Sequence, residues 1–262
     1  MRASLQKQPP GIQTKSMLNL PNKLSPLYSA TYPRSKMARA EVRRHTGTND
    51  LQRTAADPCI IEIDVLEIGS GTGLLSFMLA PHVRSLVGVD TASGMISAFN
   101  TKLASLTTPN LCAINHCLTN PDSPELQGAC ASLATQRRQK VEPPYRVDLV
   151  VSHLTLHHIP SLAEIFATMY ACLKPGGVVV LTDYEDFGPE AIRFHPESKR
   201  PGVERHGIKV DEANKILVQT GFDEVKVERA FVLRKEVDAE DVEGRVQEDM
   251  DFPFLVCFGT KR

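Results

Sequence analysis

The stretch from Val65 to Phe77 reads VLEIGSGTGLLSF and decides how the rest of the chain can fold. Its first part continues a run, starting at Ile60, that is rich in β-branched residues and is typical of a parallel strand buried on both faces. The glycines at Gly69, Gly71 and Gly73 permit positive φ angles and let a ligand approach the main chain closely. The apolar run that follows has helical character. The stretch therefore predicts a strand, a tight turn and a helix whose N-terminus cradles a ligand.

The spacing of these glycines helps to decide the kind of ligand. A dinucleotide-binding GxGxxG pattern would have its third glycine at position 74, where this chain has Leu74. Glu67 lies two residues before the first glycine, and a carboxylate there repels a pyrophosphate but suits a ligand with positive charge. S-adenosylmethionine has an ammonium and a sulfonium group and no phosphate. The turn thus favours a cationic nucleoside over a dinucleotide.

A second acid follows at the expected distance. The segment from Ser85 to Asp90 predicts a strand that ends in a carboxylate, seventeen residues beyond Gly73. Such a carboxylate can accept hydrogen bonds from two ribose hydroxyls, a role shared by nicotinamide and adenosylmethionine sites. Asp90 therefore indicates a nucleoside without choosing between these two, and an aspartate at the tip of a loop is the alternative interpretation.

The two motifs together carry a family resemblance. VLEIGSGTG followed by LVGVD resembles motif I and the second-strand acid of class I S-adenosylmethionine-dependent methyltransferases. LHHI at 156–159 and LKPGG at 173–177 strengthen the resemblance to methyltransferases of the ubiquinone and menaquinone biosynthesis type. The resemblance covers residues 60 to 260. It implies transfer of a methyl group from S-adenosyl-L-methionine to O, C or N of a small organic acceptor.

The resemblance also implies an architecture. It is an α/β, Rossmann-like fold with a mostly parallel sheet of order 3-2-1-4-5-7-6, an antiparallel last strand and helices on both faces. Apolar runs in the chain predict the required strands at 60–68, 85–90, 111–114, 147–154, 178–182, 222–233 and 252–259. The helix before the fifth strand is expected to end at the Lys174–Gly177 segment, and the acidic stretch from Glu236 to Asp251 to form an exposed loop or helix.

Cofactor contacts can be assigned only through the resemblance. Two departures from the family pattern affect them: Pro33 stands where an aspartate often follows the pre-core tyrosine, and Cys117 stands where relatives carry an acid for the adenine amino group. Tyr32 is therefore as well explained by surface packing, and a backbone carbonyl, water or His116 would replace the missing acid. The expected cofactor-binding residues are Tyr32, Glu67, Gly69, Ser70, Gly71, Gly73, Asp90, Thr91, Met95, Cys117, Leu118 and Ser152.

Histidines after the fourth strand are the candidates for proton transfer. His157 and His158 are predicted as catalytic residues, with a structural role in capping the next helix or holding the loop as the alternative. His195, His206 and Tyr184 are weaker candidates. No metal site is predicted, because the cysteines lack CxxC spacing, which also argues against a disulfide framework. These cysteines are Cys59, Cys112, Cys117, Cys130, Cys172 and Cys257.

The absence of certain motifs from the sequence narrows the range of possible methyl acceptors. The Asn/Asp-Pro-Pro-Tyr/Phe motif of many nucleic-acid and glutamine methyltransferases should follow the fourth strand, where this chain reads SHLTLHHI. A paired-glutamate loop of the protein-arginine type and a broad basic groove are also missing from the sequence. A small molecule is therefore the expected partner, with no nucleic acid. A NAD-dependent oxidoreductase and a non-catalytic methyltransferase-like scaffold remain as alternative functions.

Composition sets the remaining limits. The chain has 262 residues, a net charge of -1, 42% apolar and 23% charged residues, as expected for a globular protein in water. No apolar run is long enough to span a membrane, and no secretory segment begins the chain. We expect a disordered basic leader at 1–25, then one methyltransferase domain at 26–262 with a helical cover at 26–58 and a core at 59–262. A cytoplasmic location is expected, with a mitochondrial one as the alternative, and the oligomeric state stays open.

Overall fold

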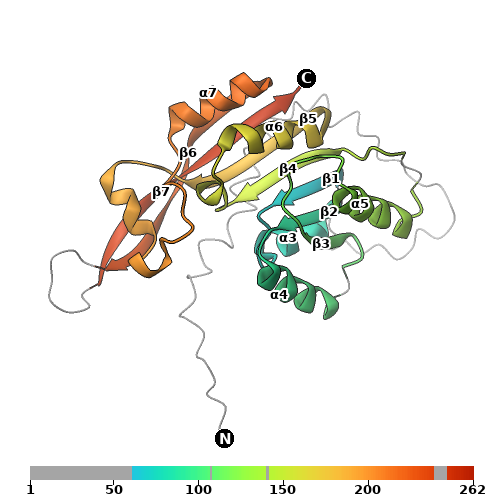
Figure 1. Cartoon of the computed structure of the whole chain (residues 1–262), viewed down its shortest axis with the longest axis horizontal. Helices are drawn as coiled ribbons and strands as arrows, with labels where there is room; N and C mark the ends of the chain where they lie inside the picture. The colour runs from blue at the N-terminus through green and yellow to red at the C-terminus, as the bar shows by residue number, and fades with distance from the viewer. Residues whose placement is uncertain (1–60, 107, 140–141, 239–246) are drawn as a thin grey trace, which may run out of the picture. The chain divides into compact units, whose positions relative to one another are not determined.

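The computed structural model describes residues 61–262 except for 107, 140–141 and 239–246 (Figure 1). All of these belong to the unit formed by residues 55–262. The leader expected at 1–25 and the cover expected at 26–58, including Tyr32, lie outside the described residues. The division of the chain into leader, cover and core therefore stays a prediction.

One seven-stranded sheet organises the described residues, with the order β3-β2-β1-β4-β5-β7-β6. The first five strands pair in parallel, whereas β7 pairs antiparallel with both β5 and β6. The predicted α/β fold class and the strand order implied by the resemblance are confirmed. The strands are β1 Ile61–Ile68, β2 Val83–Asp90, β3 Leu111–Asn115, β4 Val147–His153, β5 Leu173–Tyr184, β6 Phe222–Asp238 and β7 Gln247–Lys261.

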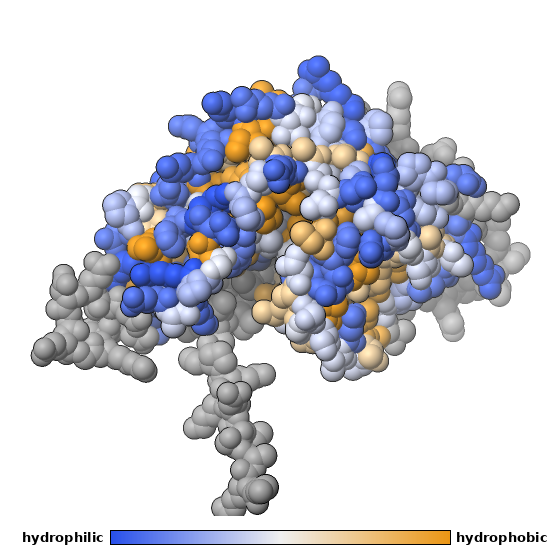
Figure 2. All heavy atoms as spheres, viewed as in Figure 1, coloured by the Kyte–Doolittle hydropathy of each residue, from blue (hydrophilic) through white to orange (hydrophobic). Residues whose placement is uncertain are grey.

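Helices cover both faces of the sheet (Figure 1). Because side chains alternate along a strand, Leu66 points into an apolar cluster with α5, α6 and α7, while its neighbour Val65 points into another with α3 and α4. Figure 2 shows polar side chains over much of the outer helices and the β6–β7 hairpin in this view, with apolar side chains mainly between the elements. The helices are α3 Leu74–Leu79, α4 Ser93–Ala104, α5 Pro124–Gln136, α6 Leu162–Cys172 and α7 Val210–Thr220.

The β6–β7 hairpin is longer than the sheet requires, and Figure 1 shows it (orange and red) continuing past the end of β5. An aromatic cluster packs on this extension and includes Tyr184, Phe194, Phe252 and Phe254. Phe194 ends the 3-10 helix η4 (Pro189–Phe194). The extension thus anchors the segment between β5 and α7, which carries two of the candidate histidines.

Two sequence-based expectations differ from the structure. The acidic stretch is a strand pair at both of its described ends, with Glu236 opposite Asp249, because Val237 is buried in the aromatic cluster while Glu236 is exposed. The expected exposed loop or helix is therefore wrong for those residues. The LKPGG segment belongs to β5 rather than to a loop after the helix, since α6 ends at Cys172 and β5 begins at Leu173 with a register shift before Val178.

A charged network joins four strands at the amino edge of the sheet. Asp64 on β1 accepts hydrogen bonds from Arg84 Nε at 2.9 Å, Ser85 Oγ at 2.6 Å and Lys174 Nζ at 3.2 Å. Lys174 also reaches Asp148 of β4 at 2.8 Å. Burial by itself would raise the pKa of Asp64, but the hydrogen bonds from Arg84 and Ser85 outweigh it and hold the pKa well below its usual range.

Replacing Asp64 by Asn should destabilise the fold by about 2 kcal/mol at neutral pH, because Arg84 loses its carboxylate partner. The lowered pKa means that the wild-type advantage is fully present above the ordinary carboxyl pKa, begins to fall below about pH 4 and is lost as the pH approaches the lowered pKa of Asp64. Urea unfolding at pH 7 and at about pH 2 measures both effects. Asp251→Asn, which breaks an exposed pair with Arg234, is the control and should change stability little. Equal losses in the two variants would contradict the prediction.

Candidate functional site

The carboxyl ends of four adjacent parallel strands meet at one edge of the sheet. The glycine turn follows β1, Asp90 ends β2, the Leu154–His158 segment follows β4, and Asp183 lies near the end of β5. Ligands of open α/β sheets bind at this edge. The sheet therefore gathers most of the sequence-predicted site residues in one region.

The three glycines of the turn have different tasks, although all three have positive φ, at 75°, 52° and 84°. A Cβ atom at Gly69 would lie 2.1 Å from Thr155 Oγ1, and one at Gly73 would lie 2.6 Å from the Phe99 ring. A Cβ at Gly71 would meet nothing within 4 Å. Gly69 and Gly73 are thus required for packing, whereas Gly71 keeps open the space in front of the turn.

Asp90 holds the turn in place. Its Oδ2 accepts the backbone N–H of Gly71 at 2.8 Å, and its Oδ1 accepts that of Ala92 at 2.8 Å. Each carboxylate oxygen can accept a second hydrogen bond, and the side chain is only half-buried. Asp90 is therefore both an anchor for the turn and an acceptor with capacity left for a ligand.

Glu67 lies beneath the turn and is only 2% exposed. The hydroxyl of Ser76 on α3 donates to its Oε2. Burial raises the pKa of Glu67 to about 8, the Ser76 hydrogen bond opposes this, and the charge of Asp90 adds to it. Without a ligand the carboxyl group is thus largely protonated at neutral pH. A cation nearby would favour its ionised form.

The remaining expected cofactor residues fall into two groups. The side chains of Ser70, Leu118 and Ser152 are buried: Ser152 Oγ donates to the Ile68 carbonyl at 2.8 Å, Leu118 belongs to the core, and Ser70 Oγ has no hydrogen-bond partner within the described part of the chain. Thr91, Met95 and Cys117 are exposed at the same edge. Contact with a cofactor stays a prediction for all six.

His157 is the more buried of the two predicted catalytic residues. It lies in the 3-10 helix η3 (Leu156–His158) and is 2% exposed. Its Nδ1 is 2.8 Å from Asp183 Oδ1, and its backbone N–H donates to Asp183 Oδ2 at 3.1 Å. Asp183 is itself 1% exposed. This buried pair fixes the ring and leaves Nε2, which has no partner among the described residues.

The other candidate histidines differ in their exposure and in their neighbours. His158 is exposed and its Nδ1 lies 2.8 Å from the Gly202 carbonyl, while the His195 ring lies 5.0 Å from the ring of His157. Burial, followed by the neighbouring His157, lowers the pKa of His195 to about 4. His206 does not belong to the group formed by the ring nitrogens of His157, His158 and His195. Tyr184 is fully buried, and burial raises its pKa, so it is the weakest candidate base.

The segment that carries His157 and His158 follows β4 and passes beside the glycine turn. Leu154 has a positive φ of 54°, a strained conformation for a residue other than glycine, and its N–H donates to the Thr182 carbonyl at 2.9 Å. Thr155 then packs against Gly69 and donates to the His153 carbonyl at 3.1 Å. The strained residue thus turns the chain from the glycine turn toward the buried His157–Asp183 pair.

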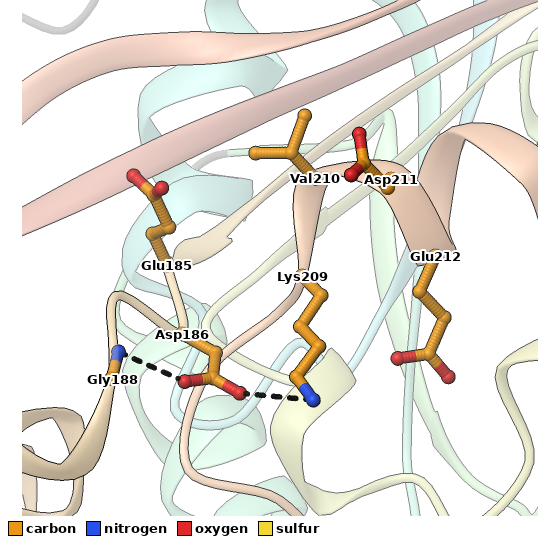
Figure 3. Close-up of a pocket in the computed structure, with 7 residues that line it drawn as sticks. All are labelled: Glu185, Asp186, Gly188, Lys209, Val210, Asp211 and Glu212. Atoms are coloured by element: carbon orange, nitrogen blue, oxygen red, sulfur yellow. Dashed lines mark hydrogen bonds and ion pairs between the residues drawn. The ribbon is translucent and has the colours of Figure 1, made fainter.

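Sequence reasoning missed Asp183, whose signal was the acid in LTDY at the end of the fifth strand. It also could not find the acidic depression beside α7 shown in Figure 3. There Asp186 accepts from the Gly188 N–H at 3.2 Å and lies 3.8 Å from Lys209, while Asp211 and Glu212 occupy the first turn of α7, where the helix dipole favours acids. These acids thus have structural roles.

Comparison with known proteins agrees with this geometry. A family model described as a methyltransferase domain matches residues 35–222. The chain belongs to the methyltransferase-domain family. The resemblance to class I S-adenosylmethionine-dependent methyltransferases is thereby confirmed, whereas the narrower ubiquinone and menaquinone type stays a prediction.

Several relatives of this methyltransferase-family chain extend the comparison. An uncharacterised methyltransferase of Schizosaccharomyces pombe is 28% identical over 55% of this chain and 48% of its own length. Phosphoethanolamine N-methyltransferase 3 of Arabidopsis thaliana is 28% identical over 68% of this chain and 34% of its own length. The chain thus spans half or less of these relatives. The YcgJ protein of Bacillus subtilis has the same fold, with a TM-score of 0.57 at 15% identity over 79% of this chain and 94% of that one.

The raised pKa of Glu67 predicts a specific pH dependence. The folded state keeps the proton up to about pH 8, while the unfolded chain loses it near pH 4.5. This contribution to stability is therefore complete below pH 4.5 and is lost as the pH rises through 8. Replacing Glu67 by Gln should remove the decline, so that the variant gains a few kcal/mol on the wild type between pH 5 and 8.

Urea unfolding of both proteins across this pH range measures the effect. Ser76→Ala is the companion variant, because it removes the hydrogen bond that opposes the shift. It should extend the decline to higher pH, because the pKa of Glu67 in the folded state rises further while that in the unfolded chain stays the same. A constant difference between wild type and Glu67→Gln would contradict the proposed protonation of Glu67.

Proposed function

We propose that this protein is an S-adenosyl-L-methionine-dependent methyltransferase that transfers the methyl group to O, C or N of a small organic acceptor. Membership of the methyltransferase-domain family supports the reaction class. The observation that carries the proposal is the hydrogen bond between the Gly71 amide and the Asp90 carboxylate, in front of the buried Glu67. This arrangement combines an open glycine turn with two carboxyl groups.

Two acids at one turn favour the proposed donor over a dinucleotide. The unused acceptor capacity of Asp90 suits the ribose hydroxyls. Glu67 suits a ligand that brings an ammonium and a sulfonium group, because such charges offset the cost of ionising a buried carboxyl. A pyrophosphate would instead face two acids. An NAD-dependent oxidoreductase is therefore the less favoured function. Dehydrogenase activity without affinity for adenosylmethionine would support it instead.

Methyl transfer requires alignment more than bond activation. A lone pair of the acceptor attacks the methyl carbon in line with the sulfur, the carbon–sulfur bond breaks toward sulfur, and the acceptor loses a proton if it carries one. The protein has to align the acceptor and exclude water. We propose His157, oriented by Asp183, as the group that accepts the proton, with the exposed His158 as the alternative.

The acceptor and the cell compartment are the finer parts of the proposal. We favour a small molecule and no nucleic acid, and the plant relative named for N-methylation of phosphoethanolamine makes an amine one option. A cytoplasmic location is supported by the cysteines, since Cys112, Cys117, Cys130, Cys172 and Cys257 are all free. No helix in the described residues is long and apolar enough to cross a membrane.

Calorimetry should detect binding of adenosylmethionine with a Kd on the order of micromolar. Asp90→Ala removes the ribose acceptor, and Gly71→Val fills the open space, so each should weaken binding about 100-fold or more. Gly176→Val is the matched control, because Gly176 also has positive φ and open surroundings but lies at the amino edge of the sheet. No heat with adenosylmethionine or with its demethylated product would refute the proposed function and favour the non-catalytic scaffold.

Binding of adenosylmethionine at pH 7 should also release protons. The positive ligand lowers the raised pKa of Glu67, so the carboxyl group ionises on binding. Calorimetric titrations in buffers with different ionisation enthalpies measure the number of protons released. Glu67→Gln should reduce this number toward zero, whereas an unchanged number would show that Glu67 does not sense the ligand.

A further inference from the structure

Three imidazoles converge at the carboxyl edge of the sheet. One ring nitrogen from each of His157, His158 and His195 can be chosen so that all three lie within 4.8 Å of one another. The residues come from two separate segments, η3 after β4 and the end of η4 after β5. Sequence spacing alone could not have placed His195 beside the other two.

His157 is arranged as a metal ligand usually is. Histidines that bind metals almost always donate their second ring N–H to a carboxylate, a carbonyl or water, which fixes the tautomer and the ring orientation. Here Asp183 engages Nδ1 at 2.8 Å, and Tyr184 N–H donates to the same carboxylate at 2.9 Å. Nε2 of His157 is buried and has no partner among the described residues, so it is available to a ligand that shares the space with the other two rings.

The second ring repeats this pattern. The Gly202 carbonyl lies 2.8 Å from Nδ1 of His158, which leaves its Nε2 available. The loop that carries both histidines is fixed by Arg205, whose guanidinium donates to the carbonyls of Leu156 at 2.8 Å and Ile159 at 2.6 Å. His195 has a buried Nδ1 without a partner in the described part of the chain.

We propose that His157, His158 and His195 form a three-imidazole site for a divalent transition metal of the zinc type. Neutral imidazoles suit such metals, and three protein ligands leave a fourth, open position. Metal–nitrogen bonds of about 2.0–2.1 Å in a tetrahedral site require the nitrogens to approach one another more closely than the 4.8 Å limit that groups them now. Rotation of the exposed His158 ring and the half-buried His195 ring can supply this movement.

The position of the metal site relative to the glycine turn suggests a role for the metal in the proposed function. Thr155, two residues before His157, packs against Gly69 of the glycine turn. If the turn binds the methyl donor as proposed, an acceptor oxygen, sulfur or nitrogen could occupy the open position on the metal, which makes an attached hydroxyl more acidic. A His157 Nε2 that binds metal cannot also accept a proton, so this role would replace the base assigned to His157 in the metal-free protein. Metal binding itself does not depend on the donor.

Titration of the metal-free protein with Zn²⁺ or Co²⁺ tests the proposal. One ion per chain should bind, and Co²⁺ should give the visible absorption of a low-coordinate site with nitrogen ligands. His158→Ala and His195→Ala should each weaken Zn²⁺ binding at least about 10-fold, and Asp183→Asn, which replaces the carboxylate that orients His157, about 10–100-fold. His206→Ala is the matched control and should bind as the wild type does.

The side chains of His158 and His195 are not fully buried, so their variants should fold even if a His157 variant does not. The proposal is overturned if the wild type binds no Zn²⁺, or if His158→Ala and His195→Ala bind it as tightly as His206→Ala. Adenosylmethionine binding without metal binding would overturn this proposal and leave the proposed function standing. Metal binding without adenosylmethionine binding would support the site and refute that function.

Discussion

The hydrogen bond from the Gly71 amide to the Asp90 carboxylate is the contact on which the rest of the site depends. It joins the turn after β1 to the end of β2, and it is possible only because Gly71 adopts a φ of 52° that leaves its surroundings open. The same turn is held from behind by Thr155 against Gly69 and by Phe99 against Gly73. One open glycine between two packed ones therefore produces a rigid cradle with free space in front of it.

Charge then selects what this cradle can hold. Glu67 is buried, and burial raises its pKa to about 8, so an empty site keeps the carboxyl group largely neutral. A cationic ligand offsets the cost of ionising the buried carboxyl group and is attracted by the resulting carboxylate, whereas a phosphate is not. At the amino edge of the sheet the half-buried Asp64 behaves in the opposite way, because it already has Arg84 and Lys174 as partners and its pKa is lowered. Asp64 and Glu67 thus differ in whether the protein itself supplies a cation as partner.

The sequence predicted the glycine turn and its two acids better than the histidine group, for physical reasons. Glycines with positive φ and acids at strand ends are local requirements, so the turn with Glu67 and Asp90 beside it followed from spacing, and the strand order followed from the family resemblance; contact of these residues with a cofactor stays a prediction. The histidine group could not be recognised, since Asp183 and His195 reach His157 only through the pairing of β4 with β5 and the docking of η4 on the hairpin. The extension of β6 and β7 into the acidic stretch was also missed, because burial of Val237 in the aromatic cluster outweighs the local charge.

Local sequence is sufficient for the α/β class, the glycine turn and the acids Glu67 and Asp90, because backbone conformation and short-range spacing encode them. Folding of the whole chain is needed to orient His157 with a buried carboxylate, to bring His195 but not His206 beside it, and to hold Leu154 in the strained conformation that turns the chain toward them. Those relations join residues far apart in the chain, and side-chain packing at the edge of the sheet, rather than any local pattern, brings them together.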